Sequence, residues 1–127
     1  MEMALNTPVR FVDLNSDGTP EVIAQGFSGE SGCSPTGNCP LWVLQKTTQG
    51  YGNLLLDAVS QSFTIERNRT NGYHDIVVAM HGSAFSSSLN VYQYKDGIYN
   101  GVACYNADWQ SPAGENLKEP LITPCNR

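Results

Sequence analysis

The feature that most constrains the fold is a series of short apolar or alternating runs, separated by Gly-containing dipeptides that favour tight turns. The runs are rich in Val, Ile, Thr, Tyr and Phe, as strands prefer. They are Val9–Leu14, Glu21–Phe27, Leu41–Thr47, Asn53–Val59, Ser62–Arg67, His74–Met80, Leu89–Tyr94 and Tyr99–Cys104. No long segment keeps the period of 3.6 that marks a surface helix. The sequence therefore predicts an all-β fold of about eight antiparallel strands, joined mostly by hairpins.

The chain also contains two similar halves. Residues 17–23 (DGTPEVI) align with residues 71–77 (NGYHDIV), and Tyr51 aligns further on with Tyr99. This pattern indicates an internal duplication of four strands per half, approximately 9–59 and 62–105. Two such units cannot close a propeller, which needs at least about four blades. We therefore expect a single domain in which the two halves form a sandwich or a small barrel.

The four cysteines lie in the two regions without a strand pattern. Cys33 and Cys39 flank a short polar turn, and Cys104 and Cys125 bracket an irregular tail over 106–127. Three connectivities are open, and we favour Cys33–Cys39 with Cys104–Cys125, because each bond closes a segment that cannot order itself by burial. Disulfides imply a periplasmic or secreted protein, whereas four reduced cysteines would imply the cytosol. Zinc is disfavoured because the sequence has no C-x-x-C pair.

Charge and hydropathy exclude several function classes. The formal net charge is −5, and charged residues make up 15% of the chain, against about 25% in ordinary domains. Nucleic acid is therefore not an expected partner, since its binding needs clustered Lys and Arg. No apolar run approaches the roughly 20 residues of a membrane helix. The first six residues lack the basic and apolar regions of a signal peptide, so we expect none here.

The sharpest motif is an acidic loop between the first two predicted strands. Oxygen-bearing side chains stand at its positions 1, 3, 5 and 9, and Gly18 at position 6 allows a sharp turn. Hard oxygen ligands of this number suit Ca²⁺. The motif is not an EF-hand, because position 12 is Ala24, and the same residues also make metal-free Asx turns.

This loop resembles the strand–loop–strand calcium loops of FG-GAP and VCBS-type repeats over residues 9–27. The resemblance implies Ca²⁺ ligands at Asp13, Asn15, Asp17, Thr19 (through its carbonyl) and Glu21.

In the second half of the chain, the first two ligand positions become Arg67 and Arg69. Arginines exclude a metal there, and a guanidinium can supply the positive charge instead, for example by pairing with Asp75. We therefore expect Ca²⁺ in the first half to be structural.

The remaining candidates for a catalytic or binding site are the histidines and the serines near them. His74 and His81 are seven positions apart on one predicted strand, so they face opposite sides and cannot easily share a site. His81 precedes a polar loop that forms the candidate binding surface, with residues His81, Ser83, Phe85, Ser86, Ser87 and Ser88. A hydrolase that uses His81 and a nearby Ser remains an alternative, although no G-x-S-x-G motif is present. The sequence assigns no catalytic residue.

Binding is the favoured function, because hairpin scaffolds present loops for recognition. Residues 32–105 resemble uncharacterised small exported bacterial β domains, and the class of small periplasmic inhibitor and immunity proteins is an analogy. The first hypothesis is a non-enzymatic exported domain that binds a protein, such as a cell-wall hydrolase, through residues 83–88. The alternative is a calcium-dependent glycan-binding module that uses aromatic side chains, among them Tyr92, Tyr94, Tyr105 and Trp109.

Overall fold

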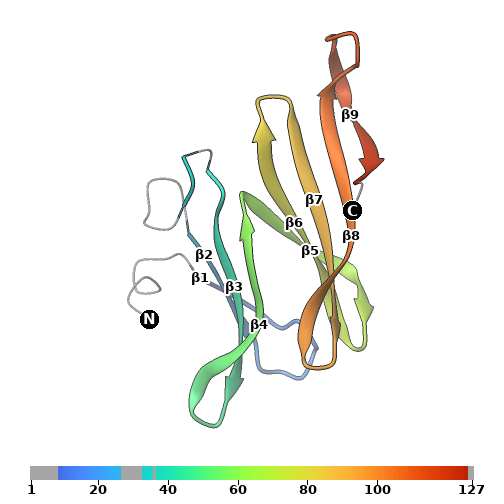
Figure 1. Cartoon of the computed structure of the whole chain (residues 1–127). Coiled ribbons are helices and arrows are strands. Elements are labelled where there is room, and N and C mark those ends of the chain that lie inside the picture. Colours follow the sequence, from blue (N-terminus) through green and yellow to red (C-terminus); the bar gives the residue numbers. More distant parts are fainter. Residues whose placement is uncertain (1–8, 27–32, 36, 126–127) are drawn as a thin grey trace.

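A computed structural model of the chain describes residues 9–26, 33–35 and 37–125 (Figure 1). The described residues form nine strands: β1 (Val9–Val12), β2 (Glu21–Gln25), β3 (Cys39–Thr47), β4 (Gly50–Ser60), β5 (Ser62–Thr70), β6 (Tyr73–Ser83), β7 (Ser86–Lys95), β8 (Ile98–Gln110) and β9 (Asn116–Pro124). β1 to β4 pair in chain order in one antiparallel sheet, and β5 to β9 pair in chain order in another. The predicted all-β class is confirmed. Phe27, the predicted end of the second run, lies outside the described residues.

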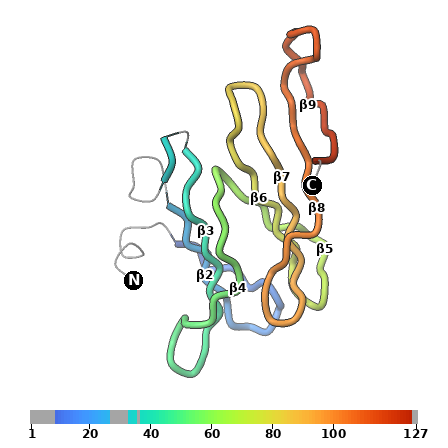
Figure 2. The backbone as a smooth tube through the Cα atoms, in the orientation of Figure 1, coloured from blue at the N-terminus to red at the C-terminus, as the bar shows by residue number. Residues whose placement is uncertain are grey.

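The two sheets share one hydrophobic core rather than closing a single barrel. Ile23, Leu41 and Val43 of the first sheet are buried in the same cluster as Ile76 and Val78 of the second. β4 leads into β5 through the single residue 61, so the chain passes directly from one sheet to the other (Figure 2). Burial of both apolar faces against each other is the main term that holds the halves together.

The two halves repeat local details at aligned positions. Tyr51 donates its hydroxyl to the carbonyl of Pro20 at 3.1 Å, and the aligned Tyr99 donates to the carbonyl of His74 at 2.8 Å. The strand pairing is also interrupted at aligned places, after Val43 in the first sheet and after the aligned Val91 in the second. These repeated features support the internal duplication.

The prediction of an irregular tail is wrong. β8 extends to Gln110, and β9 adds a fifth strand to the second sheet. The strand is not apparent in the sequence, because Pro120, Pro124 and two adjacent charged residues interrupt the alternation of apolar and polar side chains. An edge strand tolerates these residues, since one side of it needs no ladder partner and charges discourage further pairing.

Both predicted disulfides are present. Cys33 pairs with Cys39 across a Cα–Cα distance of 4.1 Å, and Cys104 pairs with Cys125 across 5.3 Å. The second bond joins β8 to the residue that follows β9. Two disulfides are consistent with an extracytoplasmic location. Within the described ranges, no helix is long and apolar enough to cross a membrane.

Replacing both Cys104 and Cys125 with Ser is expected to lower the free energy of unfolding by about 3 kcal/mol, because the unfolded chain regains the entropy of an open loop. Urea denaturation followed by circular dichroism measures the change. Replacing both Cys33 and Cys39 with Ser is the matched control; its sequence separation is 6 rather than 21, so its loss should be smaller. Wild-type stability of the Cys104/Cys125 variant would show that the tail is held by other contacts.

Candidate functional site

The acidic loop is closed by its own side chains. Asp13 Oδ2 accepts from the N–H of Gly18 at 3.0 Å, and Asp17 Oδ1 accepts from the N–H of Thr19 at 2.8 Å. Asn15 Oδ1 accepts a longer bond from the N–H of Asp17, at 3.3 Å. These are the local bonds by which Asp and Asn stabilise turns. Three side chains of the loop thus accept from backbone N–H groups of the same loop.

Glu21 is the buried acid of this region, with 1% of its surface exposed. Its Oε1 accepts from the N–H of Leu14 at 2.8 Å, whereas its Oε2 is buried without a hydrogen-bond partner. Burial raises the pKa of the Glu21 carboxyl above its ordinary value of 4.5, and repulsion from Asp17 and Asp13 adds to the rise; the Leu14 bond opposes it. Asp13 Oδ1 is likewise buried without a hydrogen-bond partner.

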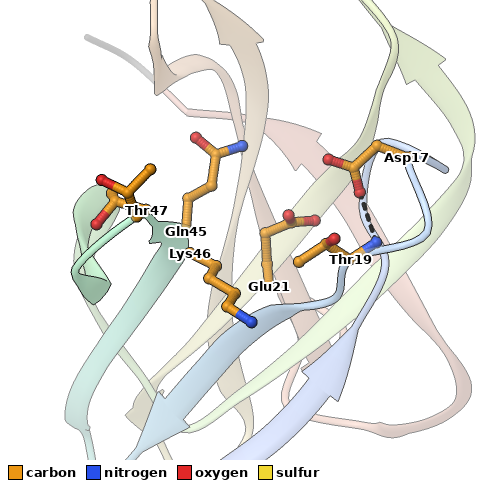
Figure 3. A pocket seen from close by; sticks show the side chains of 7 residues that line it. Asp17, Thr19, Glu21, Gln45, Lys46 and Thr47 are labelled. Atoms are coloured by element: carbon orange, nitrogen blue, oxygen red, sulfur yellow. Dashed lines mark hydrogen bonds between the residues drawn. The ribbon is translucent and has the colours of Figure 1, made fainter.

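A polar cleft of about 410 Å³ opens between the acidic loop and the β3–β4 hairpin. Figure 3 shows Glu21 between the side chains of Asp17 and Thr19 on one side and those of Gln45 and Lys46 on the other. The hairpin residues of this cleft are Gln45, Lys46, Thr47 and Thr48. Sequence reasoning missed them, because they reach the acidic loop only through the pairing of β2 with β3.

The predicted Ca²⁺ site stays a prediction in this geometry. In the part of the chain that the structure describes, no group of three His, Cys, Asp or Glu side chains is gathered closely enough to hold an ion. The buried oxygens Asp13 Oδ1 and Glu21 Oε2 nevertheless lack donors, and a hard cation would satisfy both. The donor chemistry thus fits Ca²⁺, while the acidic side chains do not yet surround one centre.

In the aligned region of the second half, side-chain amides donate hydrogen bonds to the buried carboxylate. Asp75 is 2% exposed, and its Oδ2 accepts from the side-chain amides of Asn68 and Gln93. Arg69 does not pair with it; its Nη2 donates to Ser16 Oγ in the acidic loop, at 2.6 Å. The predicted pairing of an arginine with Asp75 is therefore wrong, because Arg69 reaches across to the other half.

The second candidate region is the tip of the β6–β7 hairpin. Ser83 Oγ and Ser86 Oγ lie 2.9 Å apart, and the N–H of Trp109 donates to the carbonyl of Phe85 at 2.7 Å. Phe85 and Trp109 are each 44% exposed. They border a shallow pocket of about 150 Å³, which is also lined by Gln61, His81, Ser83, Ala84, Ser86 and Ser87. We name this set the hairpin surface.

The hairpin surface contains all the predicted binding residues except Ser88, which pairs with Met80 inside the sheet. Its base is fixed to the first half. The side-chain amide of Asn38 donates to the carbonyl of His81 at 3.0 Å, and the N–H of His81 donates back to Asn38 Oδ1 at 2.7 Å. Because Asn38 directly precedes the disulfide-bonded Cys39, these two bonds hold the hairpin base in one position.

The two candidate tyrosines of β7, Tyr92 and Tyr94, are packed within the protein. Tyr94 stacks on Tyr73 with ring centroids 3.6 Å apart, Tyr99 is buried, and Tyr92 packs against the core. Tyr105 and Trp109 stay exposed. The tyrosines of β7 therefore do not form a surface row for a glycan.

Comparisons with protein-family models, with curated proteins and with solved structures find no match to this chain. The cleft beside the acidic loop and the hairpin surface are consequently the two regions from which a function is inferred.

Glu21→Gln is expected to stabilise the metal-free protein at neutral pH. The folded-state pKa of Glu21 is raised, so its contribution to stability is complete below about pH 4.5 and is lost as the pH rises through the folded-state pKa. The variant keeps an oxygen to accept from Leu14 and removes the charge. Thermal melts in EDTA should show equal stability at pH 4 and a more stable variant at pH 7. A variant that is less stable at pH 7 would show that the ionised carboxylate is favourable there.

Proposed function

We propose that this chain is a non-enzymatic extracytoplasmic domain that binds a protein partner through the hairpin surface. The observation that carries this proposal is the exposure of Phe85 and Trp109 side by side, on backbone joined by a hydrogen bond. Large aromatic side chains are the commonest anchors of protein interfaces. A hairpin held at its base by Asn38 loses little conformational entropy on binding, which favours affinity.

The surroundings of these two aromatic residues suit recognition better than catalysis. The Ser83 hydroxyl contacts Ser86 Oγ and accepts a bond from the N–H of Phe85, so it closes the turn. Among the described residues that line the pocket, none is a carboxylate that could orient His81. A nucleophile with an oriented base is the arrangement that a hydrolase would need. Hydroxyl groups around aromatic anchors instead form a polar rim.

A cell-wall hydrolase is the partner class that we put first, with this chain as its inhibitor. The β6–β7 hairpin extends beyond the neighbouring ends of β4 and β5, and the β8–β9 hairpin beside it extends further in the same direction (Figure 1). A projecting tip with aromatic and hydroxyl groups can enter a concave cleft that normally binds a polysaccharide, since such clefts combine apolar walls with placed polar groups.

Capture experiments test this function. Wild-type protein should retain a wall hydrolase from the extracytoplasmic fraction of the source cells and inhibit its lysis of purified cell wall. The variant Phe85→Ser/Trp109→Ser should bind at least about tenfold more weakly, because it loses both anchors. Ile98→Ser, equally exposed in the β7–β8 hairpin, is the matched control and should bind normally. Equal capture by all three proteins would reject the hairpin surface, and binding to glycan alone would favour the lectin alternative.

Structural Ca²⁺ binding by the acidic loop is a second candidate function. It is supported by the buried oxygens of Asp13 and Glu21 that have no hydrogen-bond partner, and by the cleft that gives an ion access to Glu21. Ca²⁺ would draw Glu21 toward Asp13 and Asp17 and remove the repulsion among the three carboxylates. The ion would fix the junction between β1 and β2 and take no part in a reaction.

Millimolar Ca²⁺ is expected to raise the melting temperature of the wild-type protein, because an ion that binds only the folded state stabilises it by mass action. Asp13→Asn should abolish most of this shift. Asp57→Asn, an exposed position on β4, is the control and should keep it. An unchanged melting temperature in Ca²⁺ and in EDTA would show that the loop works without metal.

A further inference from the structure

The two sheets pack against each other with non-equivalent faces. In the first sheet, Ile23, Leu41 and Val43 point into the shared core. The aligned residues of the second sheet are Val77, Leu89 and Val91, and none of them belongs to that core. Side chains alternate between the two faces of a strand, so these three residues lie on the outer face of the second sheet, opposite Ile76 and Val78.

Core residues of the second sheet likewise align with outer-face residues of the first sheet. Phe63, Ile65, Ile76 and Val78 of the second sheet contribute to the core. Their aligned residues in the first sheet are Val9, Phe11, Val22 and Ala24, which alternate with core residues and lie on its outer face. Val9 and Phe11 are exposed there, whereas Val22 and Ala24 are already buried. The core therefore joins one face of the first repeat to the opposite face of the second, and each outer face is the counterpart of a face that lies in the core.

Among the described residues, both outer faces carry many apolar side chains. Phe11 is 61% exposed and Val9 is 48% exposed on the first sheet, next to Trp42 and Leu44 on neighbouring strands. On the second sheet, Val77, Leu89 and Val91 continue into Tyr105 on β8. A sheet that faces water on one side normally places polar residues there. Apolar residues on both faces of both sheets are typical of sheets that are covered on both sides.

We propose that a second copy of this chain covers these faces, with its second sheet packed against the outer face of the first sheet as the two sheets pack within one chain. The contact between the two sheets within one chain is the model for the contact between copies. Each outer face is aligned with a face that packs against the other sheet in this core. Such a head-to-tail contact either closes into a ring or continues as an open assembly. Two copies bring together four sheets, and about four is the smallest number of blades that closes a β-propeller ring.

An acid also lies on the second outer face, and side chains of its own chain already bury it. Asp75 lies on the same side of β6 as Val77, accepts from Gln93 on β7, and keeps its Oδ1 buried without a hydrogen-bond partner. Its aligned residue Glu21 lies on the covered face of the first sheet, where Tyr99 of the second sheet is its neighbour. In the proposed contact, Tyr51 of the second copy, which is aligned with Tyr99, would approach Asp75.

The test uses two full-length variants that each block one face. Phe11→Glu blocks the outer face of the first sheet, and Val91→Glu blocks that of the second; Tyr105→Glu is a more exposed second choice for the latter. Sedimentation should show an assembly of at least two chains for the wild type at concentrations up to about 0.3 mM. Each variant should associate at least about tenfold more weakly, because the interface would bury an unpaired charge. Leu121→Glu is the control and should associate like the wild type, because Leu121 is exposed on β9 and pairs with Asp108, on the opposite side of the sheet from Tyr105.

Mixing the two blocked variants distinguishes the head-to-tail contact from any symmetric one. Each variant retains the face that the other lacks, so an equimolar mixture should form a dimer that grows no further. A wild type that stays monomeric, a mixture that forms no complex, or dissociation by only one of the two face variants would each overturn the proposal. Circular dichroism of each variant identifies any protein that fails to fold, and Tyr105→Glu then replaces Val91→Glu.

Discussion

The structure depends on one interface, the apolar contact between the inner faces of the two sheets. Neither sheet buries enough surface by itself, since four or five strands need a second layer against which to bury one face. The contact is assembled from both halves at once: Leu14 of the acidic loop is fully buried in it, and its carbonyl accepts from the N–H of His74 at 2.9 Å. The core therefore also fixes the loops that surround it.

Both candidate sites derive their geometry from this contact. Glu21 is buried because its strand faces the second sheet, and that burial creates the raised pKa and the unpartnered oxygen that would favour an ion. The hairpin surface is held because Asn38 of the first half bonds the backbone of His81 in the second. A loss of contact between the sheets would consequently loosen both sites together.

The strands were predictable because alternation, turn dipeptides and strand-forming residues agree along most of the chain. β9 was missed because Pro120 and its charged neighbours are compatible with an edge strand but conceal the alternation. The disulfides followed from loop length and position. The partners of Asp75 were mispredicted, because whether an arginine turns toward its own loop or toward the neighbouring half depends on packing between the halves.

The sites were only partly predictable for the same reason. The acidic loop and residues 81–88 are local motifs, so the sequence shows them directly. Gln45 and Lys46 beside Glu21, and Gln61 beside His81, come from other strands and meet these motifs only after the sheets form. The alternation of each strand also shows which residues share a face, but not which of the two faces is buried.

Native-state hydrogen exchange tests the central claim that the two halves share one cooperative core. Amides of Ile23 and Val43 in the first sheet and of Val78 and Tyr92 in the second should exchange with the same opening free energy, equal to that of global unfolding. A lower opening free energy for either sheet, with the other still protected, would show that the halves are separately stable units and would contradict the account.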